Sequence, residues 1–287
     1  MKIFKKTIYN KSNRIARFNS TTRETSYPEV LGRKSSDWAQ YCKTNENYLD
    51  KHTFLKNYFK GRFKIWDDYL KDNLSKNQKI LSIGSGRAIN ELILINEGFD
   101  VVSSDLDIPE THEISKKIFK DNIYLKLDVL EDDIQQKFNL IFSLHTFYLF
   151  SEDQINLAFS KINKSLQKDG IFIVDMNTEH NFFSTFYHNF YLKIESILIY
   201  LFSKILNKKI GLIFDENFGY NYKKKEIIDI AIKNNFKLLS INSIGKNEIN
   251  RSFIFRKLSK NNKFIEKVLW KIFKLIPYHN IYKFKKL

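Results

Sequence analysis

Cysteine, proline and glycine are all scarce in this chain of 287 residues, which has one Cys, three Pro and nine Gly. Because Cys42 has no second cysteine to pair with, an internal disulfide is excluded, and a reducing, cytoplasmic setting is the expectation. The six histidines are scattered, so no His/Cys cluster has metal-site spacing, and we expect no metal. No window holds 18 uninterrupted apolar residues, and the N-terminus lacks the apolar segment of a signal peptide, so no membrane-spanning helix is predicted.

Acidic residues are concentrated in the middle of the chain. Residues 1–77 carry 17 basic and 8 acidic side chains, residues 78–178 carry 10 and 16, and residues 256–287 carry 10 and 1, within a net charge of +16. Two interpretations of the basic ends remain open. Either they bind an anionic partner, or they reflect a composition biased toward Lys, Asn, Ile and Phe throughout.

The apolar pattern alternates between the two-residue period of strands and the longer period of helices. It predicts strands at 79–83, 99–105, 123–129, 138–144, 171–177, 237–244 and 251–258, and helices at 88–97, 114–120, 152–166 and 223–236. Strands that alternate with helices form βαβ units. We therefore predict an α/β fold with a doubly wound, Rossmann-like, mostly parallel sheet of seven strands.

Three segments fall outside this alternation. Residues 1–77 are predicted to be a loose arm followed by a helical extension, and residues 180–218 a helical, aromatic-rich insertion after the fifth strand. Residues 259–287 contain a basic amphipathic helix at 263–277. The prediction is thus a central domain over 78–258, with an extension at each end.

The densest group of glycines lies in "ILSIGSGRAINELI", residues 80–93, between a predicted strand and a predicted helix. A glycine-rich turn at such a point lets backbone N–H groups and a helix N-terminus face a ligand. The dinucleotide fingerprint G-x-G-x-x-G accommodates Gly84 and Gly86 but places Ile89 in its third slot, where a branched side chain would crowd the helix against the strand. The spacing G-x-G-x-[GA] fits instead, with Ala88 as the third small residue.

The longer stretch "ILSIGSGRAINELILINEGFDVVSSDLD", residues 80–107, resembles the first motif and the following strand of class I S-adenosylmethionine-dependent methyltransferases. In that family the loop approaches the amino-acid part of the cofactor, and an acidic residue at the end of the second strand accepts both ribose hydroxyls. Asp105, 21 residues after Gly84, matches that residue, and a carboxylate can accept two hydrogen bonds at once. "KLDVLEDD", with Asp128 near the adenine position, "FNLIFSLHTFYLF" and "SKINKSLQKDGIFIV" resemble later motifs in the same order, so the resemblance covers about 78–258.

The resemblance implies S-adenosylmethionine as the cofactor, together with residues that bind it. Those residues are Ser82, Gly84, Ser85, Gly86, Asp105, Leu106, Asp128, Val129 and Ser143. The chain departs from the family pattern at three positions. Ser82 stands where many members have an acidic residue, Arg87 places a cation in the loop, and Asn139 replaces a common Asp.

The catalytic candidates follow the predicted fourth and fifth strands. Methyl transfer from a sulfonium depends first on alignment, and a hydroxyl acceptor also gains from a general base. His145 is the best-placed base, although it could instead hydrogen-bond the loop or pack on the cofactor. Asp175 is either a base or a helix cap, and Tyr148 either orients the acceptor or packs.

The insertion and the C-terminal helix bear on the partner. The insertion is too apolar for an exposed loop, so it caps the site, covers an oily acceptor or packs on the core. In the segment 263–276, lysines form one stripe beside a wide apolar face. Such a helix suits a membrane interface with anionic lipid, or else docks on the domain with its lysines in water.

We therefore predict an S-adenosylmethionine-dependent methyltransferase that is cytoplasmic and peripheral at the membrane. It is expected to methylate, at oxygen, a small or lipid-linked acceptor such as a glycan or a quinone-like precursor. Two alternatives remain: an RNA methyltransferase that uses the basic ends to bind nucleic acid, and a non-catalytic binding protein that keeps the fold.

Overall fold

The computed structural model describes residues 64–86, 88–109, 111–177, 182–205, 220–244, 252–273 and 279–287. Arg87, the predicted arm and most of the predicted helical extension lie outside these ranges. The chain divides into two compact units, one built largely on the sheet and the other largely on helices.

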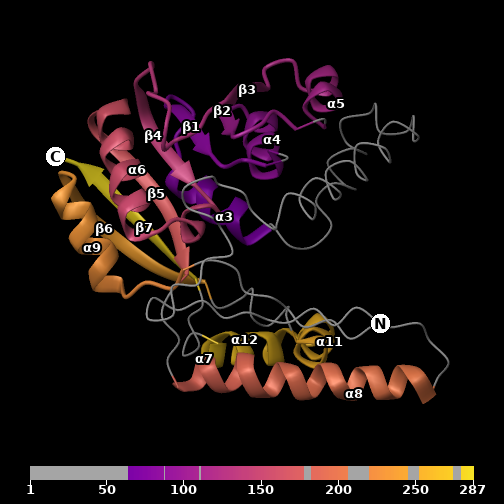
Figure 1. Ribbon diagram of the computed structural model, residues 1–287. Coiled ribbons are helices and arrows are strands. Elements are labelled where there is room, and N and C mark those ends of the chain that lie inside the picture. Colours follow the sequence, from indigo (N-terminus) through magenta and orange to yellow (C-terminus); the bar gives the residue numbers. More distant parts are fainter. Residues whose placement is uncertain are drawn as a thin grey trace. The chain divides into compact units, whose positions relative to one another are not determined.

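Seven strands form one sheet. They are β1 (Lys79–Ile83), β2 (Asp100–Asp105), β3 (Ile123–Lys126), β4 (Phe138–Ser143), β5 (Leu166–Asn177), β6 (Phe236–Ile244) and β7 (His279–Lys286), in the order β3-β2-β1-β4-β5-β7-β6. The first five strands in that order pair in parallel, as predicted. β7 runs opposite to β5, so the sheet as a whole is mixed (Figure 1).

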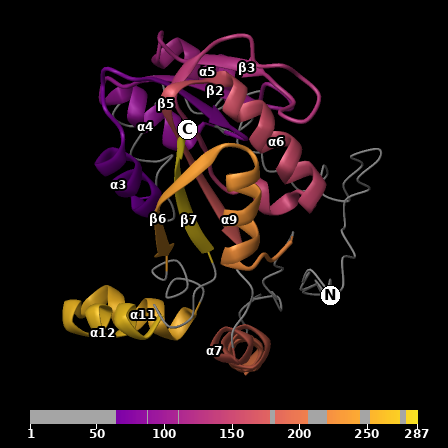
Figure 2. The same cartoon turned by 90° about the vertical axis from the view of Figure 1, so that its left-hand side faces the viewer.

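Helices cover both faces of this sheet. α3 (Lys64–Asn73) and α4 (Ile89–Asn96) lie on one face, while α6 (Glu152–Ser165) and α9 (Lys224–Lys233) lie on the other (Figure 2). α5 (Thr111–Ile118) follows β2, and a short 3-10 helix, η2 (Phe147–Leu149), follows β4. α6 begins where a capping box predicts: the Ser151 hydroxyl accepts from the Gln154 N–H, and the Gln154 side chain accepts from the Ser151 N–H.

An aromatic cluster fills the space between α6 and the sheet. Its members are the fully buried Phe147, Phe159, Phe172, Phe236 and Phe284. The ring of Phe159 lies 5.0–6.0 Å, centre to centre, from the other four rings. Burying each such side chain stabilises the fold by about 1.5–3 kcal/mol. Because Phe284 comes from β7, residues close to the C-terminus are part of this core.

One predicted strand is wrong. Residues 251–258 do not form the last strand; most of them belong to helix α11 (Phe253–Asn261), and the sheet's seventh strand is instead β7. The reason is local: Ser252 acts as an N-cap, with its hydroxyl accepting from the Phe255 N–H at 3.0 Å. The seventh strand therefore comes from the segment that the sequence had assigned to a C-terminal extension.

The second unit contains the helices that follow β5 and β6. α7 (Phe182–Phe186), the π-helix η3 (Tyr187–Tyr191) and α8 (Leu192–Ile205) lie within the predicted insertion, of which 180–181 and 206–218 fall outside the described residues. α12 (Lys263–Phe273) follows α11, within the predicted 263–277 helix. Tyr187, Leu192 and Leu269 form a small buried cluster that joins these helices. None of the helices in the described ranges is long and apolar enough to cross a membrane.

Candidate active site

The loop after β1 adopts a backbone that its small residues permit. Gly84, Gly86 and Ala88 have φ values of 74°, 53° and 55°, in the left-handed region that costs a residue with a Cβ about 1–2 kcal/mol. The N–H groups of Gly84 and Ser85 both donate to the Ser104 carbonyl, at 2.8 and 2.9 Å. The loop is thereby tied to the carboxyl end of β2.

The carboxylate of Asp105 faces this loop. Its two oxygens accept from the N–H groups of Gly86 and Leu106, both at 2.7 Å. Each oxygen keeps a second lone pair, so the carboxylate can still accept from two ligand hydroxyls. Burial raises the pKa of Asp105, and the two backbone hydrogen bonds act in the opposite direction. The sequence prediction for Asp105 therefore corresponds to an acceptor held in a fixed orientation at the loop.

A buried acid lies beneath the loop, at a position that the sequence analysis missed. Glu91, in the first turn of α4, is 2% exposed, and its Oε1 accepts from the Ser82 hydroxyl at 2.5 Å. Burial raises the pKa of Glu91 from 4.5 to about 7, against the lowering effect of the Ser82 hydrogen bond. Ser82, the position where many class I members carry an acid, is thus hydrogen-bonded to an acid from the helix. A single charged residue in the first turn of the apolar segment "INELILIN" was the available signal.

This buried acid predicts a pH-dependent stability. The folded chain keeps the Glu91 proton, whereas the unfolded chain releases it at its lower pKa, so stability is full below pH 4.5 and falls as the pH rises through about 7. A shift of this size corresponds to about 3 kcal/mol. In urea denaturation, the stability of Glu91→Gln relative to the wild type should be greater at pH 8 than at pH 5 by about 2–3 kcal/mol, because part of the effect is already lost at pH 5. Identical pH dependence in the two proteins would contradict a buried, protonated Glu91.

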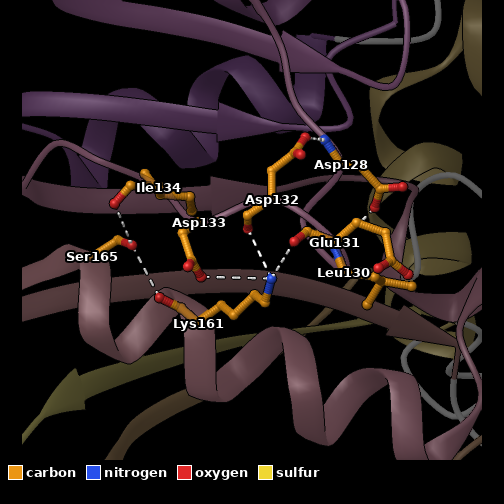
Figure 3. A network of polar contacts seen from close by, with 8 residues as sticks. All are labelled: Asp128, Leu130, Glu131, Asp132, Asp133, Ile134, Lys161 and Ser165. Atoms are coloured by element: carbon orange, nitrogen blue, oxygen red, sulfur yellow. Dashed lines mark hydrogen bonds and ion pairs between the residues drawn. The ribbon is translucent and has the colours of Figure 1, made fainter.

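The acidic loop after β3 is fixed by one lysine of α6. The Nζ of Lys161 donates to the carbonyls of Glu131 and Asp132, at 2.8 and 3.0 Å, and lies 3.6 Å from the Asp133 carboxylate (Figure 3). Within the loop, the Asp128 carboxylate accepts from the Leu130 N–H at 2.9 Å. The predicted adenine-binding segment is therefore anchored to α6 through Lys161.

His145 and Asp175 come together at the carboxyl ends of β4 and β5. His145 has a φ of 60°, and its backbone N–H donates to the Asp175 Oδ1 at 2.6 Å. Its ring Nδ1 lies 3.4 Å from the Asp175 Oδ2, longer than an ordinary hydrogen bond. The Asp175 side chain is fully buried and that of His145 is 35% exposed. Burial raises the pKa of Asp175, against the lowering effect of His145. Of the two, only the imidazole can reach a ligand.

The next residue, Thr146, connects this pair to the glycine loop. The Thr146 hydroxyl donates to the Gly84 carbonyl at 3.4 Å. Gly84 is so close to this threonine that a Cβ on it would lie 1.9 Å from the Thr146 Oγ1, whereas a Cβ on Gly86 would meet nothing within 4 Å. The loop therefore has one glycine packed against the protein and one glycine beside open space.

The other predicted cofactor residues occupy two kinds of position. Ser82 and Ser143 are buried, and the Ser143 hydroxyl donates to the Ile83 carbonyl at 2.8 Å, so it joins the ends of β4 and β1. Val129 is also buried, whereas Leu106 is 51% exposed next to Asp105.

Tyr148 lies in η2, with its ring edge-on to His145 at 6.5 Å between centres. The Asn139 side chain accepts from the Lys79 N–H at 2.8 Å, a structural role at the start of β1.

Comparison with known proteins supports the architecture. No protein-family profile and no curated protein matches the chain. Among solved structures, a TehB-like methyltransferase from Corynebacterium glutamicum is 15% identical, with a TM-score of 0.50 over 91% of this chain and 100% of its own. The cyclopropane synthase MmaA2 from Mycobacterium tuberculosis is 18% identical, with a TM-score of 0.51 over 78% of this chain and 84% of its own. A magnesium protoporphyrin IX methyltransferase from Synechocystis, with bound S-adenosylmethionine, is 11% identical, with a TM-score of 0.50 over 91% of this chain and 94% of its own.

This chain has the class I methyltransferase fold. The resemblance first read from residues 80–107 is confirmed at this level. In the class I fold, the strand order reverses between β1 and β4, and ligands of open α/β sheets bind at the carboxyl ends of the strands at such a point. The glycine loop and His145 follow β1 and β4, Asp105 is the last residue of β2, and Asp175 lies two residues before the end of β5.

Proposed function

We propose that this protein binds S-adenosylmethionine at the loop 84–88 and transfers its methyl group to an oxygen of a small or lipid-linked acceptor. The observation that carries the proposal is the pairing of an open glycine loop with a fixed carboxylate. Gly86 leaves room above the loop, and Asp105 offers two acceptor oxygens beside it. Structures of similar fold hold S-adenosylmethionine or S-adenosylhomocysteine, which supports the choice of ligand.

Glu91 compensates in this proposal for the acid that β1 lacks. The amino-acid end of S-adenosylmethionine carries an ammonium, and a negative charge beneath the loop favours its binding. Ser82 has no charge, but its hydroxyl is bonded to the Glu91 carboxyl. Because burial brings the pKa of Glu91 to about 7, a bound cation would shift the carboxyl toward its charged form at neutral pH.

The acceptor side favours a hydroxyl. The cofactor supplies a methyl group already activated on a sulfonium, so the chain must supply alignment and, for a hydroxyl, a base. His145 is partly exposed, and the Asp175 carboxylate lies beside its Nδ1. A proton held on Nδ1 leaves Nε2 as the basic nitrogen. A small or isoprenoid-like acceptor is consistent with the range of the fold, which includes a geranyl diphosphate C-methyltransferase from Streptomyces coelicolor.

Calorimetric titration with S-adenosylmethionine tests the proposal. Asp105→Asn is expected to weaken binding roughly 10- to 100-fold, because the amide keeps one acceptor oxygen and loses the other, and one hydrogen bond to a charged group is worth about 1.5–3 kcal/mol. Asp107→Asn is the matched control: its carboxylate is exposed and bonds Lys126, so it removes the same charge two residues away. Absence of binding to well-folded wild type at millimolar cofactor would refute the proposal, and equal affinities of the two variants would refute the role of Asp105.

A further inference from the structure

An apolar face runs along the exposed side of the helices after β5. It begins at the end of α7 and continues through η3 and α8, with its members three or four residues apart. They are Phe186, Phe190, Ile194, Ile197, Leu201 and Ile205. These side chains are 42–75% exposed. We call this set the apolar stripe. Helices of globular proteins normally turn such a stripe toward the core, so its exposure marks an interaction surface.

The buried side of the same helix holds a charged residue. Glu195 of α8 is 5% exposed, and its Oε1 accepts from the Ser252 hydroxyl at 2.8 Å and from the Ile254 N–H at 2.9 Å. Its neighbours on this side, Tyr187 and Leu192, belong to the buried cluster. Turning the apolar stripe inward would break these hydrogen bonds and leave the Glu195 carboxylate without these partners. The outward orientation of the stripe is therefore fixed by the fold.

A second apolar row lies on α12, beside lysines. Phe264, Val268 and Ile272 recur every four residues and are 75%, 41% and 48% exposed. Each is preceded directly by an exposed lysine: Lys263, Lys267 and Lys271. We call these three lysines the lysine row. Leu269, which follows Val268 on α12, is buried. Among residues 182–205 and 252–273, eight side chains are basic and only Glu195 and Glu266 are acidic.

We infer that this helical unit binds the surface of a bilayer that contains anionic lipid, through the apolar stripe and the lysine row. Phenylalanines and branched aliphatic residues enter the boundary between headgroups and acyl chains, and lysines beside them contact lipid phosphates. The charge favours this partner, because the only acid of α8 is bonded inside the unit. One side of the helical run 182–205 is packed within the unit through Leu192 and Glu195, so the contact is along the membrane surface, with one leaflet. The inference stands independently of methyl transfer.

Vesicle flotation tests the charged part of the contact. The full chain is expected to float with phosphatidylcholine vesicles that contain phosphatidylglycerol, and far less with phosphatidylcholine alone. Replacing Lys263, Lys267 and Lys271 by Gln should weaken binding roughly 100-fold, about fivefold for each lysine. The matched control replaces Lys116, Lys117 and Lys120, exposed on or just after α5, by Gln. Equal binding of the two triple variants, or no flotation of the wild type, would overturn the inference.

A second set of variants tests the apolar part and separates it from self-association. Phe186→Ser, Phe190→Ser and Ile197→Ser together should abolish flotation, while Ile123→Ser, Leu157→Ser and Ile232→Ser, at exposed sites on β3, α6 and α9, should leave it intact. Light scattering on a size-exclusion column should find the wild type monomeric. A dimer that the stripe variant disrupts would show that a second copy covers the stripe, and would overturn the inference. Circular dichroism and cofactor binding, measured on every variant, report folding and the proposed function separately.

Discussion

Gly84→Ala is expected to destabilise the cofactor-free protein by roughly 3 kcal/mol or more. The φ of +74° costs a residue with a Cβ about 1–2 kcal/mol, and the new Cβ would lie 1.9 Å from the Thr146 Oγ1 and 2.8 Å from the Thr146 Cβ. Relieving that overlap requires a shift of β1 against the turn after β4, and overpacking of this kind costs about 1–3 kcal/mol more. Urea denaturation at fixed pH gives the difference directly.

Two controls isolate the cause. Gly86→Ala has a similar positive φ but open space around its Cβ, so it should cost only about 1–2 kcal/mol. In a Thr146→Gly background the three atoms that crowd position 84 are gone, and Gly84→Ala should then cost about as little as Gly86→Ala. Equal losses from Gly84→Ala in the two backgrounds would show that backbone strain, rather than Thr146, decides the requirement for glycine.

Gly84 and Gly86 are therefore required for different reasons, because Gly84 is packed against Thr146 and Gly86 is not. The motif alone could not distinguish these two reasons. The spacing of Gly84, Gly86 and Ala88 predicted a loop between strand and helix, and the structure has a loop there, with positive φ at all three residues. Local sequence could predict the loop because strand, turn and helix signals are adjacent in the chain. It could not predict Thr146, which is 62 residues from Gly84 along the chain.

The same limit explains the other differences from the prediction. The five parallel strands were predictable because βαβ units are built from neighbouring segments. The last strand was not, because two segments alternate in a strand-like manner, "RSFIFRKL" and "HNIYKFKK", and only the Ser252 cap shows that the first is helical. Likewise, the sequence showed only that Ser82 departs from the family pattern, and it could not predict that the fold brings the Glu91 carboxyl to the Ser82 hydroxyl.

Replacing His145 by Ala is expected to lower turnover by about 10²- to 10⁴-fold, the usual contribution of a general base, with little change in cofactor affinity. The reason is geometric: the ring lies at the carboxyl end of β4, and the neighbouring Thr146 contacts the loop at Gly84. Formation of S-adenosylhomocysteine with a panel of phenol and quinol acceptors measures the rate. Added imidazole should restore part of the rate to the alanine variant, because a base can diffuse into the space that the ring leaves.

Asp175 acts in this scheme as a positioning residue. In Asp175→Asn, the amide can present an N–H to the His145 Nδ1, which favours the tautomer whose Nε2 carries the proton. Turnover should therefore fall while cofactor affinity holds, and the double variant should be no slower than His145→Ala alone, since both changes remove one function. Tyr148→Phe, which keeps the ring beside His145, is the control and should retain most of the rate if that ring only packs. Additive losses from His145 and Asp175 would mean that the two residues act separately, and a full rate in His145→Ala would mean that alignment of the acceptor suffices without a base.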